Sequence, residues 1–165
     1  MLYQLSFKPL NEEDLLTVKE IYDYYIHHST ATFHTELITI SELKEYIYIN
    51  HPRYRSYLIL CDEVPAGFCY YTHFKKRQAY DRTAEVAIYL RPEFCDKGIG
   101  PKALAFLEKE AKDSGIKNLI ALVTGNNFPS IKIFERLGYK KVAHFEKVGE
   151  KLGQVLDVLA YQKEL

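Results

Sequence analysis

The feature that most constrains this chain is a pair of glycines, Gly98 and Gly100, placed between an apolar strand and a helix. Residues 83–90 have the sequence Thr-Ala-Glu-Val-Ala-Ile-Tyr-Leu, which is typical of a buried strand. In residues 101–113 the apolar side chains recur at helical spacing, and Gly115 is a suitable C-terminal stop. Glycines at such a junction let backbone N–H groups approach an anion, and the start of the helix adds a favourable dipole. The junction therefore predicts a phosphate-binding loop.

Two well-known phosphate loops can be compared with this junction. Residues 98–103 fit the dinucleotide pattern G-x-G-x-x-A, but that pattern needs a tight turn directly after the strand, and residues 91–97 intervene here. It also expects an acid near the end of the next strand, but residues 124–125 contain no acid. The mononucleotide pattern G-x-x-x-x-G-K-[ST] is absent around these glycines. The motif alone leaves open a flexible loop that ends in a helix cap.

The rest of the chain predicts strands and helices in mixed order. Strands are expected at residues 3–7, 57–61, 67–72, 83–90, 119–123, 141–145 and 155–161. Helices are expected after the cap at 11–14, from about residue 41, at 101–113 and at 127–138. The apolar run 119–123 predicts a strand buried on both faces, and Gly149 and Gly153 predict the last turn. We expect one mixed α/β (α+β) domain over residues 1–165, with a sheet of six or seven strands flanked by helices.

The overall charge limits the kinds of partner. The chain carries 22 lysines and arginines against 22 aspartates and glutamates, so its formal net charge is zero. This balance argues against binding nucleic acid or a membrane surface through bulk charge. No apolar run approaches the ~20 residues of a membrane span, and the opening residues lack the apolar segment of a secretory signal. We therefore expect a reduced, cytoplasmic protein.

The cysteines and histidines do not predict a metal site or a covalent mechanism. The three cysteines and six histidines are scattered, and none of them shows a metal-ligand spacing. No Cys–His arrangement is visible around Cys95, so we do not expect an acyl-enzyme intermediate.

One acidic residue, Glu85, interrupts the apolar strand 83–90 shortly before the loop. Burial there would raise the pKa of its carboxyl group and make it a better base near neutral pH. Acyl transfer to an amine needs such a base, because the nucleophile must be neutral and amines begin as ammonium ions. The alternative is a carboxylate paired with Arg82 or another cation on an exposed face, and the residue alone leaves both open.

Two motifs in order along the chain resemble the GNAT superfamily of acyl-CoA N-acyltransferases. The loop signature of that superfamily is [QR]-x-x-G-x-[GA], and residues 95–100 here are Cys-Asp-Lys-Gly-Ile-Gly. The second signature is N-x-x-[AS]-x-x-x-[YFH]-x-x-x-G-[FY], which residues 127–139 match. Cys95 departs from the first pattern, which loses a side-chain contribution to the loop but leaves its backbone amides.

Over nearly its whole length the chain is similar to one branch, the phosphinothricin and the methionine sulfone or sulfoximine N-acetyltransferases. The similar blocks are 21–26, 33–36, 53–54, 74–85, 149–153 and 157–158. The resemblance implies a GNAT fold, acetyl-CoA as the co-substrate, no metal, and transfer to the amine of a small amino acid or analogue. It also implies a homodimer.

The resemblance further implies which residues hold acetyl-CoA. The sheet would be splayed between the strand with Glu85 and the strand 119–123, with CoA in the split as an added strand. The pantetheine would hydrogen-bond the backbone of Ile88 and Leu90, and Tyr89 between them would also belong to the cofactor site. The pyrophosphate would lie on Asp96, Lys97, Gly98, Ile99, Gly100 and Pro101. Asn127 would hold the pantetheine arm, with Ser130 and Phe134 at the thioester end.

On the acceptor side, the resemblance implies a site formed by Phe33, Lys75, Arg77, Tyr80 and Arg82. The three cations would hold an acidic acceptor such as an amino acid carboxylate. The alternative is a solvated, charged hairpin turn. A pocket closed by Tyr80 and residues 75–82 would favour small acceptors, and a wide open groove would favour a peptide or protein N-terminus.

Three positions depart from the branch. Phe134 stands where many members have Tyr or His to protonate the leaving thiolate, so water or another tyrosine such as Tyr139 would supply that proton. His34 replaces an arginine that is common in this branch, and Val155 replaces a common aromatic residue. Both changes weaken the expectation that the herbicide substrate of the branch is also a substrate of this protein. A non-catalytic CoA-binding module is therefore a further alternative.

Overall fold

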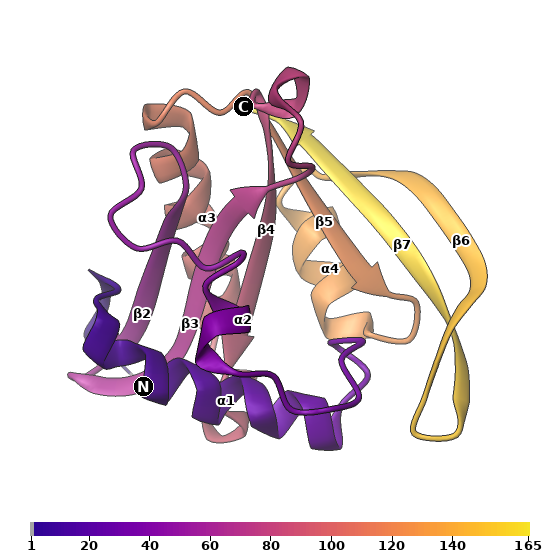
Figure 1. Ribbon diagram of the computed structural model, residues 1–165, viewed down its shortest axis with the longest axis horizontal. Coiled ribbons are helices and arrows are strands. Elements are labelled where there is room, and N and C mark those ends of the chain that lie inside the picture. The colour runs from indigo at the N-terminus through magenta and orange to yellow at the C-terminus, as the bar shows by residue number, and fades with distance from the viewer. Residues whose placement is uncertain (1) are drawn as a thin grey trace.

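The computed structural model describes residues 2–165, which form one seven-stranded sheet with helices on both faces (Figure 1). The strands are β1 (Leu5–Pro9), β2 (Arg55–Cys61), β3 (Val64–His73), β4 (Thr83–Leu90), β5 (Asn118–Thr124), β6 (Lys140–Lys151) and β7 (Gln154–Glu164). The α-helices are α1 (Leu15–His28), α2 (Ile40–Leu43), α3 (Ile99–Asp113) and α4 (Phe128–Arg136). Short 3₁₀ turns lie at Glu12–Asp14, Gln78–Tyr80 and Pro92–Phe94. The expected mixed sheet of six or seven strands is confirmed.

The sheet opens between its fourth and fifth strands. The strand order is β1-β2-β3-β4-β5-β7-β6, and every neighbouring pair is antiparallel except β4 and β5. The parallel pair covers only Thr83↔Asn118, Ala84↔Leu119 and Glu85↔Ile120. Beyond Glu85 the two strands diverge, as Figure 1 shows. The split implied by the resemblance therefore begins directly after Glu85.

Two hydrophobic clusters, one on each face, hold the sheet between its helices. In Figure 1, α1 and α2 cover one face and α3 and α4 the other. Ala84 and Val86 of β4 belong to the cluster that contains Leu104 and Leu107 of α3. Tyr89 packs against the cluster of α1 and α2. Because side chains alternate along a strand, Glu85 lies on the α1 face with Tyr89.

Two details of the sequence interpretation were wrong. The strand β5 is not buried on both faces, because Leu122 is 47% exposed where the sheet opens. Gly149 does not lie in the last turn, which is formed by Leu152 and Gly153 at positive φ. Gly149 instead pairs with Leu156 inside β6–β7, and a Cβ built there would lie 2.4 Å from Cε2 of Phe33. This glycine lets an aromatic ring approach the strand.

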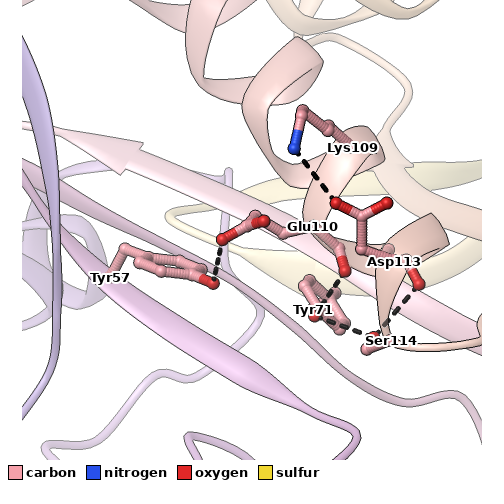
Figure 2. A network of polar contacts seen from close by, with 7 residues as sticks. Tyr57, Tyr71, Lys109, Glu110, Asp113 and Ser114 are labelled. Atoms are coloured by element: carbon pink, nitrogen blue, oxygen red, sulfur yellow. Dashed lines mark hydrogen bonds and ion pairs between the residues drawn. The ribbon is translucent and has the colours of Figure 1, made fainter.

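The C-terminal end of α3 is attached to the sheet by two tyrosines (Figure 2). The hydroxyl of Tyr71 on β3 donates to the carbonyl of Glu110 at 3.2 Å and lies 3.0 Å from Oγ of Ser114. The hydroxyl of Tyr57 on β2 donates to the Glu110 carboxylate at 3.1 Å. Both rings are buried, so their hydroxyls find partners at the helix end.

Replacing Tyr71 by Phe is expected to lower the free energy of unfolding by about 1 kcal/mol, because it removes one hydrogen-bond partner of the part-buried Glu110 carbonyl and Ser114 hydroxyl. Urea unfolding followed by circular dichroism measures the change. Lys109→Ala is the matched control, since it breaks only the exposed Lys109–Asp113 pair on the same helix and should have little effect. Equal losses in the two variants would contradict the role of Tyr71.

Candidate active site

A pocket of about 520 Å³ lies on the α1 face and spans both sides of the split. Its walls come from α1, from the loop that follows it, from β3 and β4 on one side, and from β5 and β7 on the other. The lining residues are Tyr22, Ala31, Thr32, Phe33, His34, Tyr46, Tyr70, Thr72, His73, Phe74, Glu85, Tyr89, Leu122, Val123, Thr124 and Val158. A pocket placed where the sheet separates can admit two molecules that meet from opposite directions.

Glu85 is the one carboxylate among the residues that line this pocket. It lies half-buried on β4, opposite Thr72 of β3 and Ile120 of β5. Burial raises the pKa of its carboxyl group, and the positive charge of Lys75, the smaller effect, acts in the other direction. Within residues 2–165 no cation lies within 4.0 Å of Glu85, so the ion pair with Arg82 that the sequence left open is not formed. The geometry suits a proton acceptor.

The aromatic floor of the pocket was not found by sequence reasoning. Tyr22 of α1, Tyr46, Tyr70 of β3 and Tyr89 of β4 converge there from four separate segments. The high tyrosine count of 14 is the one signal in the sequence, and it does not say which tyrosines meet. Only the folded sheet and the packing of α1 bring them together.

The loop after α1 brings Phe33 and His34 into the pocket. Nδ1 of His34 lies 2.6 Å from the hydroxyl of Tyr22, which also contacts Thr32. Phe33 was expected at the acceptor site, and it lines the pocket with its ring against Gly149. His34 was noted in the sequence only as a departure from a common arginine.

The basic residues expected at the acceptor site lie around the pocket rather than in its wall. Lys75 stacks over the ring of Phe74 at 5.3 Å, and Arg77 over the ring of Tyr80 at 5.9 Å. Tyr80 in turn packs edge-on against Phe74, with ring centroids 5.7 Å apart. Of this segment only Phe74 lines the pocket, and Arg82 is exposed nearby. Residues 75–82 therefore do not close the pocket in a single chain.

The edge of β4 that faces the split offers free backbone groups. The N–H of Arg91 donates to the carbonyl of Ala66 on the β3 side at 2.8 Å. Since backbone groups alternate in direction along a strand, those of Ile88 and Leu90 point toward the split, while those of Tyr89 point toward β3. The carbonyl of Leu90 accepts a hydrogen bond from the hydroxyl of Tyr25 on α1. The remaining groups of Ile88 and Leu90 suit an extended, amide-containing ligand.

The glycine loop has the shape of an anion site. Asp96 and Gly98 adopt positive φ values of 59° and 76°, and Gly98 is the N-cap of α3. The first N–H groups of a helix have no acceptor within it, so those of Ile99 and Gly100 are available to a ligand. A Cβ at Gly98 would meet nothing within 4 Å, whereas one at Gly100 would lie 3.0 Å from Cδ1 of Ile133 on α4. Gly98 leaves the approach to the amides open.

The glycine loop also carries positive charge, and Tyr3 near the N-terminus binds its backbone. The hydroxyl of Tyr3 donates to the carbonyl of Lys97, and the ammonium of Lys102 lies 5.6 Å from the ring of Tyr3. The ammonium of Lys97 lies over Phe94 at 5.7 Å. The two lysines flank the glycines, where they would favour a pyrophosphate.

The second signature lies in α4 and the turn after it. The side chain of Asn127 caps α4 by accepting from the N–H of Ser130 at 3.4 Å. Phe134 is 8% exposed and packs in the core against the rings of Tyr139 and Tyr161. Phe134 does not line the pocket, so the structure does not bring it together with Glu85.

Tyr139, the other tyrosine considered as a proton donor, is buried beside Phe134. Burial raises the pKa of its hydroxyl, and the ammonium of Lys163 lies 5.6 Å from its ring. Within the described residues its hydroxyl has no hydrogen-bond partner, and it does not line the pocket. Among residues 2–165, no three His, Cys, Asp or Glu side chains form a group that could hold a metal ion.

Comparison with known proteins agrees with this geometry. Residues 7–160 match the family "Acetyltransferase (GNAT) domain". The chain is 29% identical to phosphinothricin N-acetyltransferase of Streptomyces viridochromogenes, over 97% of this chain and 87% of that protein. It is 25% identical to the L-methionine sulfoximine/L-methionine sulfone acetyltransferase of Salmonella typhimurium, over 98% and 95% of the two chains.

A solved structure extends the likeness to the fold. The GNAT superfamily phosphinothricin acetyltransferase of Sinorhizobium meliloti in complex with AcCoA superposes with a TM-score of 0.90 at 27% identity, over 100% of this chain and 89% of that one. The sheet split, the glycine loop at the start of α3 and the family match over residues 7–160 agree. This chain belongs to the GNAT acetyltransferase family.

Proposed function

We propose that the protein transfers the acetyl group of acetyl-CoA to the amine of a small amino acid or amino acid analogue. The observation that carries the proposal is a half-buried carboxylate, Glu85, at the point where β4 and β5 separate. The open edge of β4 and the glycine loop suit the donor, and the pocket suits the acceptor. The names of the two relatives support phosphinothricin and methionine sulfone as acceptor types. Residues 1–165 act as one domain in this proposal.

The donor would lie along the split. Ile88 and Leu90 would bind its pantetheine amides through their backbone, and Tyr89 would pack beneath the arm from the α1 face. Residues 96–101 would bind the pyrophosphate, and the start of α4 around Asn127 and Ser130 would border the arm. The cap formed by Asn127 supports this, because it fixes the start of α4 beside the split.

The chemistry in this proposal is direct transfer. Glu85, directly or through one water, removes a proton from the acceptor ammonium, and the neutral nitrogen attacks the thioester carbonyl. A β4 backbone N–H that points into the split stabilises the oxyanion. The adduct nitrogen loses its second proton to solvent, and the carbon–sulfur bond breaks to give the amide. The CoA thiolate takes its proton from water, since Phe134 has none to give and Tyr139 lies in the core.

The acceptor would be held by Phe33 from the loop after α1 and by the basic segment around Lys75, Arg77 and Arg82. Tyr80 would contribute indirectly, by packing against Phe74 in the pocket wall. The open side of the pocket favours a second candidate, a peptide N-terminus, because residues 75–82 do not close it in one chain.

A thiol-release assay with acetyl-CoA separates these candidates. We expect saturable CoA release with L-methionine sulfone, and little with short peptides that have a free N-terminus. Higher kcat/KM for peptides would replace the small-acceptor proposal with the peptide one. Tight acetyl-CoA binding without release to any amine would instead support the non-catalytic module.

We also propose that the protein is a cytoplasmic homodimer that associates through β6 and β7. Five apolar side chains with about half of their surface exposed lie on this hairpin, namely Val142, Phe145, Val148, Leu152 and Val155. The hairpin stands at the open edge of the sheet (Figure 1). Such a patch is typical of an interface. The three cysteines are free, which supports a reducing compartment, and no helix within residues 2–165 meets the length and hydropathy of a membrane span.

Replacing Val148 by Lys is expected to convert the dimer to monomer, because it places a charge in the proposed interface. Sedimentation velocity at several protein concentrations measures the change. Leu16→Lys is the control, since Leu16 is 70% exposed on α1 outside the hairpin and should leave association unchanged. A wild-type protein that sediments as a monomer at all concentrations would refute the dimer.

A further inference from the structure

Lys151, the last residue of β6, is a buried cation outside the chemistry described above. It is 5% exposed, and burial lowers the pKa of its ammonium group. Its Nζ donates to the carbonyl of Thr32 at 2.8 Å and to that of Tyr25 at 3.2 Å. Among the described residues no carboxylate lies within 4.0 Å of it. A buried ammonium is unfavourable unless its donors are satisfied, so these two carbonyls determine its position.

The two carbonyls lie at either side of the segment that enters the pocket. Tyr25 is in the last turn of α1, where its carbonyl also accepts from the N–H of Ser29 at 3.2 Å. A cation at this end of the helix is favoured by the helix dipole. Thr32 directly precedes Phe33 and His34, which line the pocket. Lys151 therefore joins the end of the helix to the start of the pocket wall. We call residues 29–34 the pocket loop.

Several other contacts of the pocket loop come from the same half of the chain as Lys151. The hydroxyl of Thr124 on β5 donates to the carbonyl of Thr30 at 2.6 Å, and that of Thr30 donates to Oδ1 of Asn126 at 3.1 Å. The ring of Phe33 lies against Gly149 of β6. Tyr22 of α1 also contacts Thr32 and His34, so the loop is held both from the α1 side and by β5 and β6 on the far side of the split.

We propose that Lys151 is a positioning residue that fixes the pocket loop in the arrangement that binds the acceptor. Its ammonium touches neither the reacting atoms nor the donor site, and it acts through Thr32 on Phe33 and His34. Without it the Thr32 carbonyl would have no buried donor, and the loop would populate other conformations. Acceptor binding would then weaken, while donor binding would not. The kinetic part of this inference rests on the proposed function, but the structural part does not.

The kinetic test compares Lys151→Met with Lys163→Met. Methionine keeps most of the stem and removes the donors. Lys163 is the matched control, because its Nζ also bonds a carbonyl, that of Leu137 at 2.7 Å, and the Glu108 carboxylate at 2.8 Å, away from the pocket. Lys151→Met should raise the KM for L-methionine sulfone by about tenfold with the KM for acetyl-CoA unchanged. Lys163→Met should leave both KM values unchanged.

The structural test needs no acceptor. Amide hydrogen exchange of the pocket loop in the full-length protein should be faster in Lys151→Met than in wild type, and unchanged in Lys163→Met. If Lys151→Met does not fold, Thr124→Val removes the neighbouring bond to Thr30 and should accelerate exchange in the same loop. If the pocket loop of folded Lys151→Met exchanged at the wild-type rate, the inference would be overturned. If Lys151→Met did not fold, the same result in Thr124→Val would overturn it.

The two tests also separate this inference from the proposed function. If exchange were faster in Lys151→Met but the wild-type enzyme acetylated no amino acid, the positioning role would still hold and the proposed acceptor class would be refuted. A raised acceptor KM with an equal rise in the acetyl-CoA KM would refute the positioning role, because the whole site would have been disturbed.

Discussion

Replacing Glu85 by Gln is expected to lower kcat by about 10²-fold or more at neutral pH, because the amide cannot take the proton of the acceptor ammonium. The side chain keeps its size and its half-buried place on β4, so the KM for acetyl-CoA should change little. Steady-state CoA release measures both parameters. Glu110→Gln is the control, since that carboxylate lies on α3 next to Tyr57 and outside the pocket, and its loss should leave kcat unchanged.

The pH dependence of the wild-type enzyme gives a second readout of the same carboxyl group. Burial raises the pKa of Glu85 in the folded protein, so its basic form is lost at a higher pH than for an ordinary glutamate. The rate should therefore fall as the pH drops through this raised pKa, and Glu85→Gln should lack that acidic limb. Unchanged turnover in Glu85→Gln, or an identical acidic limb, would show that another group is the base.

Replacing Gly98 by Val is expected to raise the KM for acetyl-CoA by about tenfold or more. A branched side chain at a φ of 76° is strained by roughly 1–2 kcal/mol, and it would fill the open space in front of the first N–H groups of α3. Relief of this strain would turn the amides away from the pyrophosphate. Initial rates at varied acetyl-CoA concentration measure the effect.

Gly115→Val separates strain from loss of the binding site. Gly115 lies just beyond α3 at a φ of 93°, and a Cβ there also meets nothing within 4 Å. Both variants should lower the free energy of unfolding by similar amounts, but only Gly98→Val should alter the KM for acetyl-CoA. If Gly115→Val raised that KM equally, the glycine loop would have no special part in donor binding.

The local elements could be predicted from the sequence because each carries its own signal. The strand 83–90 was expected with its final bounds, and the helix after the glycines begins at Ile99, two residues before the expected start. Alternation along a strand also fixes Glu85 on the face opposite Ala84 and Val86. The sequence could not show that this face is the α1 face, since that depends on which helix packs there.

The features that the sequence could not predict depend on tertiary packing. Leu122 lies in an apolar run and is exposed because β4 and β5 part beside it. Lys75 and Arg77 lie on aromatic rings beside the pocket instead of in its wall. The pocket loop depends on Lys151, which is 119 positions from Thr32 along the chain. No local pattern indicates such a contact.

The most direct test of the central claim is the identity of the product. Acetyl-CoA and L-methionine sulfone should be incubated with wild-type protein and with Glu85→Gln, and the products analysed by mass spectrometry. The proposed function predicts the N-acetyl amino acid and free CoA in equal amounts with wild type, and a rate about 10²-fold lower with the variant. Free CoA without an acetylated amine, or equal rates for the two proteins, would contradict it.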